Sequence, residues 1–393
     1  MQIAELTAYE VRLPLRREIK HASATRESSD NLLICCRLHD GTLGWGEGVP
    51  RDYVTGETVA GAFEQLAASP LSEQLSADCG DWPGVLAMCD RFQPAAMKDD
   101  PRGCYGNALR CAVELSILDA FGKRFHQPVS SVIAHCPFAS SVRTNLSRVR
   151  YSAAITAESR RKEMVSAVKF HVYGFAQCKI KVGMPGSDDP SRLRRLRRVL
   201  GRRMDIRIDA NEAWHATEVV GKLEPLLPCN VTCVEQPVPH AEVAALAEVR
   251  RKLNVPIMLD ESLTSLIDAQ AALRDGTCDI FNIRLSKCGG YVHSLRLAAL
   301  ARQHGLQYQL GCHPGESGIL SAAGRHWAST VADIRYLEGS YDRHILKERL
   351  TDEDLTFGYG GWAPSFAGPG LGITVQPATV ARTASRQQSF RIA

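Results

Sequence analysis

The sequence lacks a marked excess of charge of either sign. Its 393 residues include 47 Lys and Arg against 43 Asp and Glu, which gives a formal net charge of +4, and only 7% of the residues are aromatic. A protein that binds nucleic acid or an anionic membrane usually carries a basic stripe with interleaved aromatic residues. We therefore expect neither nucleic acid nor a membrane as a partner.

Long apolar runs and metal-type cysteine patterns are also missing. No window approaches the roughly 18 consecutive apolar residues of a membrane-spanning helix. The first residues, MQIAELTAYEVRLPLRR, alternate like a strand and have no apolar stretch behind a basic start, so we expect no signal peptide. The 13 cysteines form no CxxC pair and no Cys/His cluster at zinc spacing. Buried, reduced thiols in a cytoplasmic protein explain them best.

The first part of the chain predicts a small α+β unit. Residues 3–13 alternate like a strand, and residues 31–38 and 43–49 flank an Asp-Gly turn that predicts a hairpin. The polar residues 16–30 predict a loop. Helical periodicity follows, most clearly over residues 107–125.

Eight short β-branched segments then recur at a regular spacing. They occupy residues 149–155, 178–182, 205–210, 231–237, 256–262, 280–287, 306–312 and 334–340. Polar residues at their ends are 25 to 28 residues apart, the length of one strand-helix unit; they are Lys181, Asp209, Glu235, Asp260, Lys287, His313 and Glu338. This spacing predicts an α/β protein with a closed parallel TIM-like barrel, (β/α)7β, behind an N-terminal α+β capping domain.

The same pattern divides the chain into three parts. We expect the capping domain over residues 1–130, the barrel over residues 131–345 and a C-terminal segment over residues 346–393. Within the last part, residues 370–375 (GLGITV) predict a strand that returns to the capping domain.

Three acids end three successive strands of the predicted barrel. The carboxylates of Asp209, Glu235 and Asp260 should converge near the barrel axis, because the strand carboxyl ends meet there. Hard oxygen ligands with no His or Cys nearby suit Mg²⁺. Three unrelated salt-bridging acids are the alternative, which their common phase in the repeat makes less plausible. Asn211 and Glu261, next to two of these acids, are expected to orient the ligands.

Lysines flank the acids on both sides. Lys179 and Lys181 are two residues apart on one strand and so face the same side. Two neighbouring ammonium groups lower the pKa of one of them towards the range of a general base. Lys287 lies beyond the acid-bearing strands, so the α-carbon of a metal-bound carboxylate would lie between two lysines. Removing its proton creates a dianionic enediolate, which needs a divalent cation and cationic neighbours.

Five motifs make the sequence similar to a known family. They are K-I-K at 179–181, D-A-N at 209–211, V-E-Q-P at 234–237, D-E-S at 260–262 and K-C-G-G at 287–290. The helix at 114–129 and the hairpin at 44–58 also match, so the chain resembles the muconate-lactonizing-enzyme subgroup of the enolase superfamily over nearly its whole length.

The resemblance implies a function for the motif residues. Lys181 and Lys287 would be the acid/base pair, Lys179 would tune Lys181, and the three acids would bind Mg²⁺. It also implies that two cap loops, residues 13–31 and 50–58, close over the substrate and that the protein is a homo-oligomer.

The candidate substrate contacts depart from the family pattern. Relatives carry a G-C-M-x-E-S-like run after the seventh strand, and this chain has GCHPGES, with His313 and Glu316 as candidates. His313 also allows the alternative of a histidine base, as in the mandelate-racemase branch. Dipeptide epimerases resemble D-x-D at the eighth strand, where they hold the substrate ammonium, and of this pair the chain keeps only Glu338.

A second anionic group on the substrate is a further possibility. Arg16, Arg17, Lys20 and His21 of the first cap loop could meet such a group, although solvated loop charge explains them more simply. We predict a Mg²⁺-dependent isomerase of a small carboxylate substrate: a cycloisomerase, racemase or epimerase. A Mg²⁺-dependent dehydratase of a hydroxy acid and a barrel that binds an anion without catalysis are the alternatives.

Overall fold

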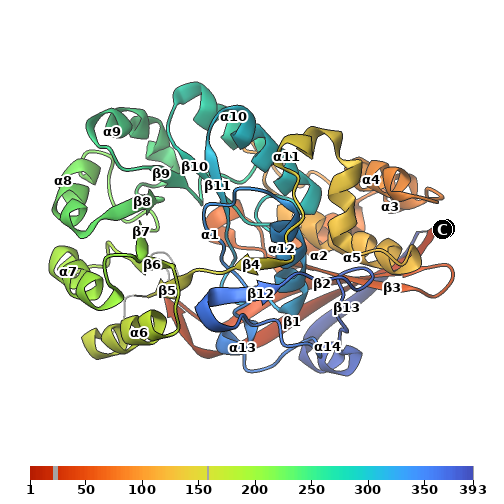
Figure 1. Ribbon diagram of the computed structural model, residues 1–393. Helices are drawn as coiled ribbons and strands as arrows, with labels where there is room; N and C mark the ends of the chain where they lie inside the picture. The colour runs from red at the N-terminus through yellow and green to blue at the C-terminus, as the bar shows by residue number, and fades with distance from the viewer. Residues whose placement is uncertain (21–24, 157–158, 393) are drawn as a thin grey trace.

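The computed structural model describes residues 1–20, 25–156 and 159–392, and two sheets organise it (Figure 1). The first is antiparallel, in the order β13-β1-β2-β3. Its strands are β1 (Ile3–Lys20), β2 (Thr25–Leu38), β3 (Leu43–Gly48) and β13 (Ala384–Arg391). Cys35 pairs with Trp45 between β2 and β3, so the predicted hairpin is confirmed.

Helices follow β3 along the chain, and the second and fifth of them pack against the antiparallel sheet. They are α1 (Asp52–Thr55), α2 (Val59–Ala68), α3 (Leu71–Leu75), α4 (Trp82–Arg91) and α5 (Asn107–Arg124). Three glycines of β3 let α5 lie directly against the strand. A Cβ atom at Gly44, Gly46 or Gly48 would collide with backbone atoms of Ser116, Ala112 or Ala108. The alternating glycines of LGWGEG therefore serve close packing rather than a turn.

The second sheet is parallel and curled, in the order β11-β10-β9-β8-β7-β6-β5. Its strands are β5 (Ala153–Ile155), β6 (Gln177–Lys181), β7 (Asp205–Asp209), β8 (Val231–Glu235), β9 (Ile257–Leu259), β10 (Ile280–Ile283) and β11 (Gln307–Leu310). Figure 1 shows helices following these strands around the outside of the sheet. These are α6 (Arg160–Val172), α7 (Asp189–Leu200), α8 (Val219–Leu223), α9 (Leu246–Lys252), α10 (Leu266–Asp275), α11 (Tyr291–Gln303) and α12 (Gly318–Thr330).

Shorter elements complete the described structure. β4 (Arg148–Arg150) and β12 (Trp362–Pro364) form a two-stranded sheet. The remaining helices are α13 (Asp342–Ile345), α14 (Pro377–Thr383) and the 3₁₀ turns Val129–His135, Pro137–Val142, Glu224–Cys229, His240–Ala245 and Tyr359–Gly361. No helix in the described ranges is long and apolar enough to cross a membrane.

An extended segment joins the two edges of the parallel sheet. The amide of Glu338 donates to the carbonyl of Leu310 at the β11 edge, at 2.9 Å. On the other side, the carbonyl of Leu337 accepts from the amide of Ser152, next to β5, at 2.8 Å. This segment corresponds to the eighth predicted strand, although it contributes only a bridge to Leu310.

Two predictions about the first sheet are wrong. Most of residues 16–30, predicted as a loop, extend β1 and β2, because the two strands pair through Lys20 and Thr25. Residues 370–375 form no strand and make isolated bridges at Gly370, to Pro128, and at Val375, to Thr351. The strand that returns to the first sheet is β13, which pairs antiparallel with β1.

Buried carboxylates hold the antiparallel part against the parallel part. Glu47 of β3 accepts from the amides of Ser317 and Leu320, at the start of α12. Glu114 of α5 accepts from the amide of Tyr291, at the start of α11. Each carboxylate thus meets the amino end of a helix, where unpaired N–H groups and the helix dipole favour negative charge.

Candidate active site

The ends of neighbouring parallel strands bring the predicted residues together. Lys181, Asp209 and Glu235 are the last residues of β6, β7 and β8, and they pair in register across the sheet. Asp260 follows β9 directly. The placement that the repeat predicts for these side chains is therefore observed, since parallel strands in register carry their end residues to one edge.

Lys179 lies among three carboxylates. Its Nζ is 3.3 Å from Asp209 Oδ2, 3.5 Å from Glu235 Oε1 and 2.8 Å from Glu338 Oε1. Burial opposes the charge of Lys179, but these three carboxylates outweigh it and raise the pKa of the lysine above its usual value. Lys179 is therefore a fixed cation of the site and a poor proton acceptor.

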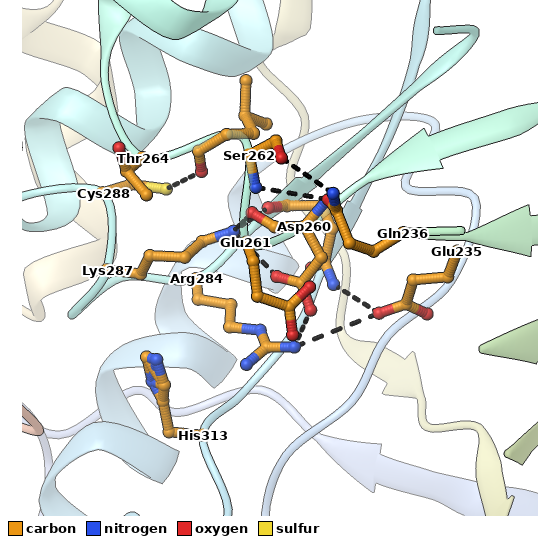
Figure 2. A network of polar contacts seen from close by, with 12 residues as sticks. Glu235, Gln236, Asp260, Glu261, Ser262, Thr264, Arg284, Lys287, Cys288 and His313 are labelled. Carbon is orange, nitrogen blue, oxygen red and sulfur yellow. Dashed lines mark hydrogen bonds and ion pairs between the residues drawn. The ribbon is translucent and has the colours of Figure 1, made fainter. Parts of the chain in front are cut away.

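Asp260 has two cationic partners of its own (Figure 2). Arg284 Nη2 contacts Asp260 Oδ2 and is 4.0 Å from Glu235 Oε1. Lys287 Nζ donates to Asp260 Oδ1 at 2.8 Å, to the Asp260 carbonyl at 2.5 Å and to the Asn282 carbonyl at 2.9 Å. Burial lowers the pKa of Lys287 to about 8. The sequence predicted that Lys287 would face the substrate across the open end of the barrel. In the structure its amino group is instead bonded to Asp260.

Lys181 lines the main cavity, as Lys179 does and Lys287 does not. It is half-buried and lines the main cavity together with Asp209, Asn211 and Glu261. Burial is the largest cause that lowers the pKa of Lys181, and the charge of Lys179 adds to it, while Asp209 and Glu261 oppose it. The direction of this shift is the one expected from the K-I-K spacing.

Amide side chains connect the strand ends. The backbone N–H of Asn211 donates to Asp209 Oδ1 at 3.0 Å, and its Nδ2 donates to Glu261 Oε1 at 3.4 Å. Gln236 Oε1 accepts from the amides of Asp260 and Ser262, at 2.8 and 3.2 Å. Gln236 fixes the turn that carries Asp260. Gln236 lies inside the V-E-Q-P motif, and this motif was the sequence feature that could have identified it as a site residue.

The three acids suit a hard divalent cation because they offer carboxylate oxygens and because one of these oxygens, on Glu235, accepts no hydrogen bond within the described residues. Their oxygens share partners, since Lys179 contacts two of them and Arg284 contacts Asp260 and approaches Glu235. The buried Glu235 Oε2 accepts no hydrogen bond within the described part of the chain. Those residues contain no three Asp, Glu, His or Cys side chains already at ligand spacing. Lysine and arginine lie between the acids, so an ion that took these oxygens as ligands would displace their cationic partners.

Arg207 was not predicted and lies inside the sheet. It is fully buried, with Nη2 2.5 Å from Glu338 Oε1 and Nε 3.8 Å from Glu235 Oε2. Arg207 and Asp209 are two residues apart on β7, so they face the same side. The alternation of the strand was therefore a signal for Arg207 that the sequence reasoning missed.

A cavity of about 1500 Å³ opens from the strand ends. Lys181, Asp209, Arg284 and Glu338 are among its lining residues. The β1–β2 hairpin contributes Arg16, Arg17 and Arg26, and residues 341–357 line another side. His21 and the side chain of Lys20 lie outside the described part of the chain.

Two of the predicted substrate contacts, His313 and Glu316, lie in the turn after β11 and outside the lining of the main cavity. His313 is buried and Glu316 is half-buried. Glu316 Oε1 accepts from the backbone amide of His313 at 2.6 Å, and burial raises the pKa of Glu316 to about 8. Burial, with the charge of Arg284 next, lowers the pKa of His313 well below its usual value.

Glu338 does line the cavity, but its charge is already matched. Lys179 and Arg207 hold its carboxylate and lower the pKa of Glu338 to about 2 against the effect of burial. An acid held between two buried cations is a poor partner for the ammonium group of a substrate.

Comparisons with known proteins indicate one protein family. A family model described as "Enolase C-terminal domain-like" matches residues 162–379. The chain is 27% identical over 336 residues to the hydrophobic dipeptide epimerase of Enterococcus faecalis, covering 85% of this chain and 89% of that protein. It is also 27% identical over 340 residues to the N-succinyl-L-Arg/Lys racemase of Bacillus cereus, covering 86% and 87%.

Solved structures agree on the fold. That of the N-succinyl Arg/Lys racemase of Bacillus cereus superposes with a TM-score of 0.86 at 24% identity and covers 100% of both chains. That of a dipeptide epimerase from Enterococcus faecalis, complexed with Mg and the dipeptide L-Leu-L-Tyr, gives a TM-score of 0.81 at 24% identity and covers 95% of this chain and 100% of that one.

Proposed function

Because the chain belongs to the enolase C-terminal domain-like family, we propose that it is a Mg²⁺-dependent racemase or epimerase of an amino-acid derivative. It removes the proton α to the substrate carboxylate through an enediolate and returns a proton on the other face. The curated relatives named above are an epimerase and a racemase, which supports this class of isomerase.

One observation carries the proposal: Lys181, with a lowered pKa, faces the cavity beside three carboxylates at the strand ends. A general base works best when its pKa lies near the working pH, and burial with a neighbouring ammonium group moves a lysine in that direction. Lys181 is therefore the base or acid on one face of the substrate α-carbon.

The charge of the site supports a dianionic intermediate. Its buried cluster contains equal numbers of acids and bases: Asp209, Glu235, Asp260, Glu261 and Glu338 against Lys179, Lys181, Arg207, Arg284 and Lys287. Asp209, Glu235 and Asp260 would hold Mg²⁺, which supplies a Lewis acid for the substrate carboxylate. A divalent cation added to a formally neutral cluster leaves two positive charges, the number that an enediolate dianion needs.

Lys287 is the second acid/base residue in this proposal. All three of its N–H donors are bonded, two of them to Asp260 and one to the Asn282 carbonyl. Engagement of Asp260 by another cation would release Lys287 for the opposite face of the α-carbon. The pKa of about 8 would then allow Lys287 to exchange a proton near neutral pH.

The fold proposal follows from the edge contacts. We take residues 334–340 as the eighth strand of a (β/α)7β barrel, with residues 1–130 as the capping domain and residues 346–393 returning to it. Hydrogen bonds from this segment to both edges of the parallel sheet support the closure.

Deuterium exchange tests the function. The protein is incubated with Mg²⁺ in D₂O and with pools of dipeptides, N-acylamino acids, hydroxy acids and muconates, and products are read by mass and by chiral separation. We expect α-deuteration and inversion of a dipeptide or an N-acylamino acid, abolished by chelator and by Lys181→Ala. Lys252→Ala, at an exposed lysine that pairs with Glu248, is the matched control and should retain full exchange.

Other outcomes would replace the proposal. Loss of water from a hydroxy acid would favour the dehydratase. Metal-dependent ligand binding with no exchange in any pool would favour a barrel that binds an anion without catalysis. Exchange that survives in Lys181→Ala would contradict the role given to Lys181.

A further inference from the structure

Arg284 directly follows the strand β10 and reaches the cavity at the strand ends. It lies two residues beyond Asn282, whose Nδ2 donates to Glu235 Oε1 at 2.8 Å. Alternate positions along a strand point to the same side, and Arg284 keeps the inward phase of Asn282, since it lines the main cavity. Its Nη2 contacts Asp260 Oδ2 and lies 4.0 Å from Glu235 Oε1 (Figure 2). Arg284 is therefore both a cavity residue and a partner of the acids.

Lys287, three residues further on, does not line the cavity. Its side chain is fully buried, and its N–H donors are bonded to Asp260 and to the carbonyl of Asn282. A turn separates Lys287 from the strand, because the amide of Cys288 donates to the carbonyl of Arg284 at 2.9 Å. Of the two cations that contact Asp260, Arg284 is therefore the one at the cavity surface.

Lys181 and Arg284 flank the acids from opposite ends. The strand β6, which ends at Lys181, and the strand β10, which precedes Arg284, are separated in the sheet by β7, β8 and β9. The three acids belong to the ends of these intervening strands. A substrate whose carboxylate lies near the acids therefore has an ammonium group on one side and a guanidinium group on the other.

Arg284 also keeps a donor that no protein group uses. Its side chain is only 9% exposed, yet its Nε has no acceptor within the described residues. Asp260 does not depend on Arg284 alone for charge compensation, because Lys287 lies 2.8 Å from its other carboxylate oxygen. A buried N–H without an acceptor destabilises the folded state. The guanidinium is therefore suited to donate to an anionic oxygen that enters the cavity.

We propose that Arg284 is a further catalytic residue, which donates hydrogen bonds to the oxygens of the enediolate from the side opposite Lys181. The inference rests on the proposed function, in which the α C–H bond breaks, its electron pair moves into the enediolate and Lys181 takes the proton. A guanidinium stays protonated in proteins, so Arg284 stabilises the added negative charge without exchanging a proton itself. Displacement of Arg284 from Asp260 by an ion would leave the guanidinium available for these oxygens.

The two sides of the substrate are unequal in this arrangement. Lys181 lines the cavity, whereas Lys287 has to leave its hydrogen-bond partners before it transfers a proton on the side of Arg284. Each lost hydrogen bond raises the barrier to inversion. We expect the α-proton on the side of Lys181 to exchange with solvent at least about tenfold faster than the substrate inverts.

Oxalate tests the anion site without the reaction, because this planar dianion carries the charge of an enediolate. Its dissociation constant is measured by calorimetry at saturating Mg²⁺, with acetate as the singly charged comparison. Arg284→Gln should weaken oxalate binding by about 10- to 100-fold and acetate binding by no more than about threefold. Arg284→Lys should restore part of the oxalate affinity.

Kinetics test the catalytic role with the pools of dipeptides and N-acylamino acids in D₂O. For compounds that exchange with the wild-type protein, Arg284→Gln should lower kcat by about 100-fold and change KM by less than about threefold. Arg284→Lys should restore part of kcat. It should also raise the ratio of inversion to exchange, because an ammonium group at this position can transfer a proton. A merely structural role of Arg284 would not change this ratio.

Arg335→Gln is the control, because Arg335 pairs with Asp205 at 3.0 Å and does not line the cavity. This variant should keep the wild-type oxalate affinity, kcat and ratio of inversion to exchange. The folding of Arg284→Gln is checked first by circular dichroism, and Arg284→Lys carries the test if Arg284→Gln does not fold.

The failures of the two proposals are distinguishable. If no compound exchanges its α-proton while oxalate binding still depends on Arg284, the proposed function fails and the anion site stands. If the wild-type protein exchanges α-protons and Arg284→Gln matches it in kcat and in oxalate affinity, the function stands and the role of Arg284 is refuted. Equal losses of oxalate and acetate affinity in Arg284→Gln, or a wild-type protein that does not bind oxalate, would also refute this role.

Discussion

Glu338 provides the sharpest test of the buried ion network. Glu338→Gln removes one negative charge from between Lys179 and Arg207, whose nitrogens lie 2.8 and 2.5 Å from its carboxylate. Breaking a buried pair by removing one partner costs about 3 to 5 kcal/mol. Both cations keep contacts with Glu235, at 3.5 and 3.8 Å, so we expect the low end, about 3 kcal/mol.

Urea unfolding of Glu338→Gln and wild-type protein measures this difference. Asp333→Asn is the control, because Asp333 precedes the same segment and pairs with Arg302 at 2.6 Å, but its side chain is 65% exposed. An exposed pair contributes only about 0 to 1 kcal/mol. If Glu338→Gln costs no more than this control, the Lys179–Glu338–Arg207 contacts do not stabilise the protein and the reasoning is refuted.

Three further predictions follow from other contacts. Arg284→Gln removes a cation from Asp260 and should lower the Mg²⁺ concentration for half-maximal thermal stabilisation by about tenfold. Arg335→Gln, beside Asp205 at 3.0 Å, should leave this concentration unchanged. An unchanged concentration in both variants would contradict competition between Arg284 and Mg²⁺ for Asp260. Burial raises the pKa of Glu114 from 4.5 to about 7, so the folded state binds the proton more tightly and stability falls as pH rises from about 4.5 to 7, by at most about 3 kcal/mol. Glu114→Gln should flatten this part of the plot of melting temperature against pH. An unaltered slope would show that Glu114 does not cause this pH dependence. Gly46→Ala should lower the free energy of unfolding by about 3 kcal/mol, since the added Cβ meets the backbone of α5. Gly80→Ala, with open space around it, should change this free energy little. Equal melting temperatures for the two variants would contradict the close packing of β3 against α5.

The repeat in the sequence predicted the arrangement of the site because strand ends of a parallel sheet meet at one edge. Lys181, Asp209 and Glu235 follow from their spacing alone, and the register of β6, β7 and β8 agrees. The predicted family and isomerase class are confirmed by the family match and by the relatives.

Other features had weak or misread signals. β13 reads ASRQQSFR, a polar and largely exposed edge strand without the apolar alternation that identifies buried strands. Arg207 has the phase of Asp209 but looks like an ordinary strand residue unless its inward face is considered. His313 and Glu316 lie in a turn, where strand phase no longer determines direction, and the burial of His313 depends on neighbours distant in the sequence.

The N-terminal part of the chain fixes the turn that carries Lys287. Asn107, at the start of α5, donates from Nδ2 to the carbonyls of Lys287 and Thr264, both at 2.8 Å. The amide of Val49 donates to Ser286 Oγ at 2.8 Å. The amino group of Lys287 reaches Asp260 only while the backbone of this turn stays in place, so the position of a proposed acid/base residue depends on hydrogen bonds from Asn107 and Val49. The placement of Lys287 therefore depends on the packing of the N-terminal part of the chain against the parallel sheet, and a change that loosens this packing should impair proton transfer by Lys287.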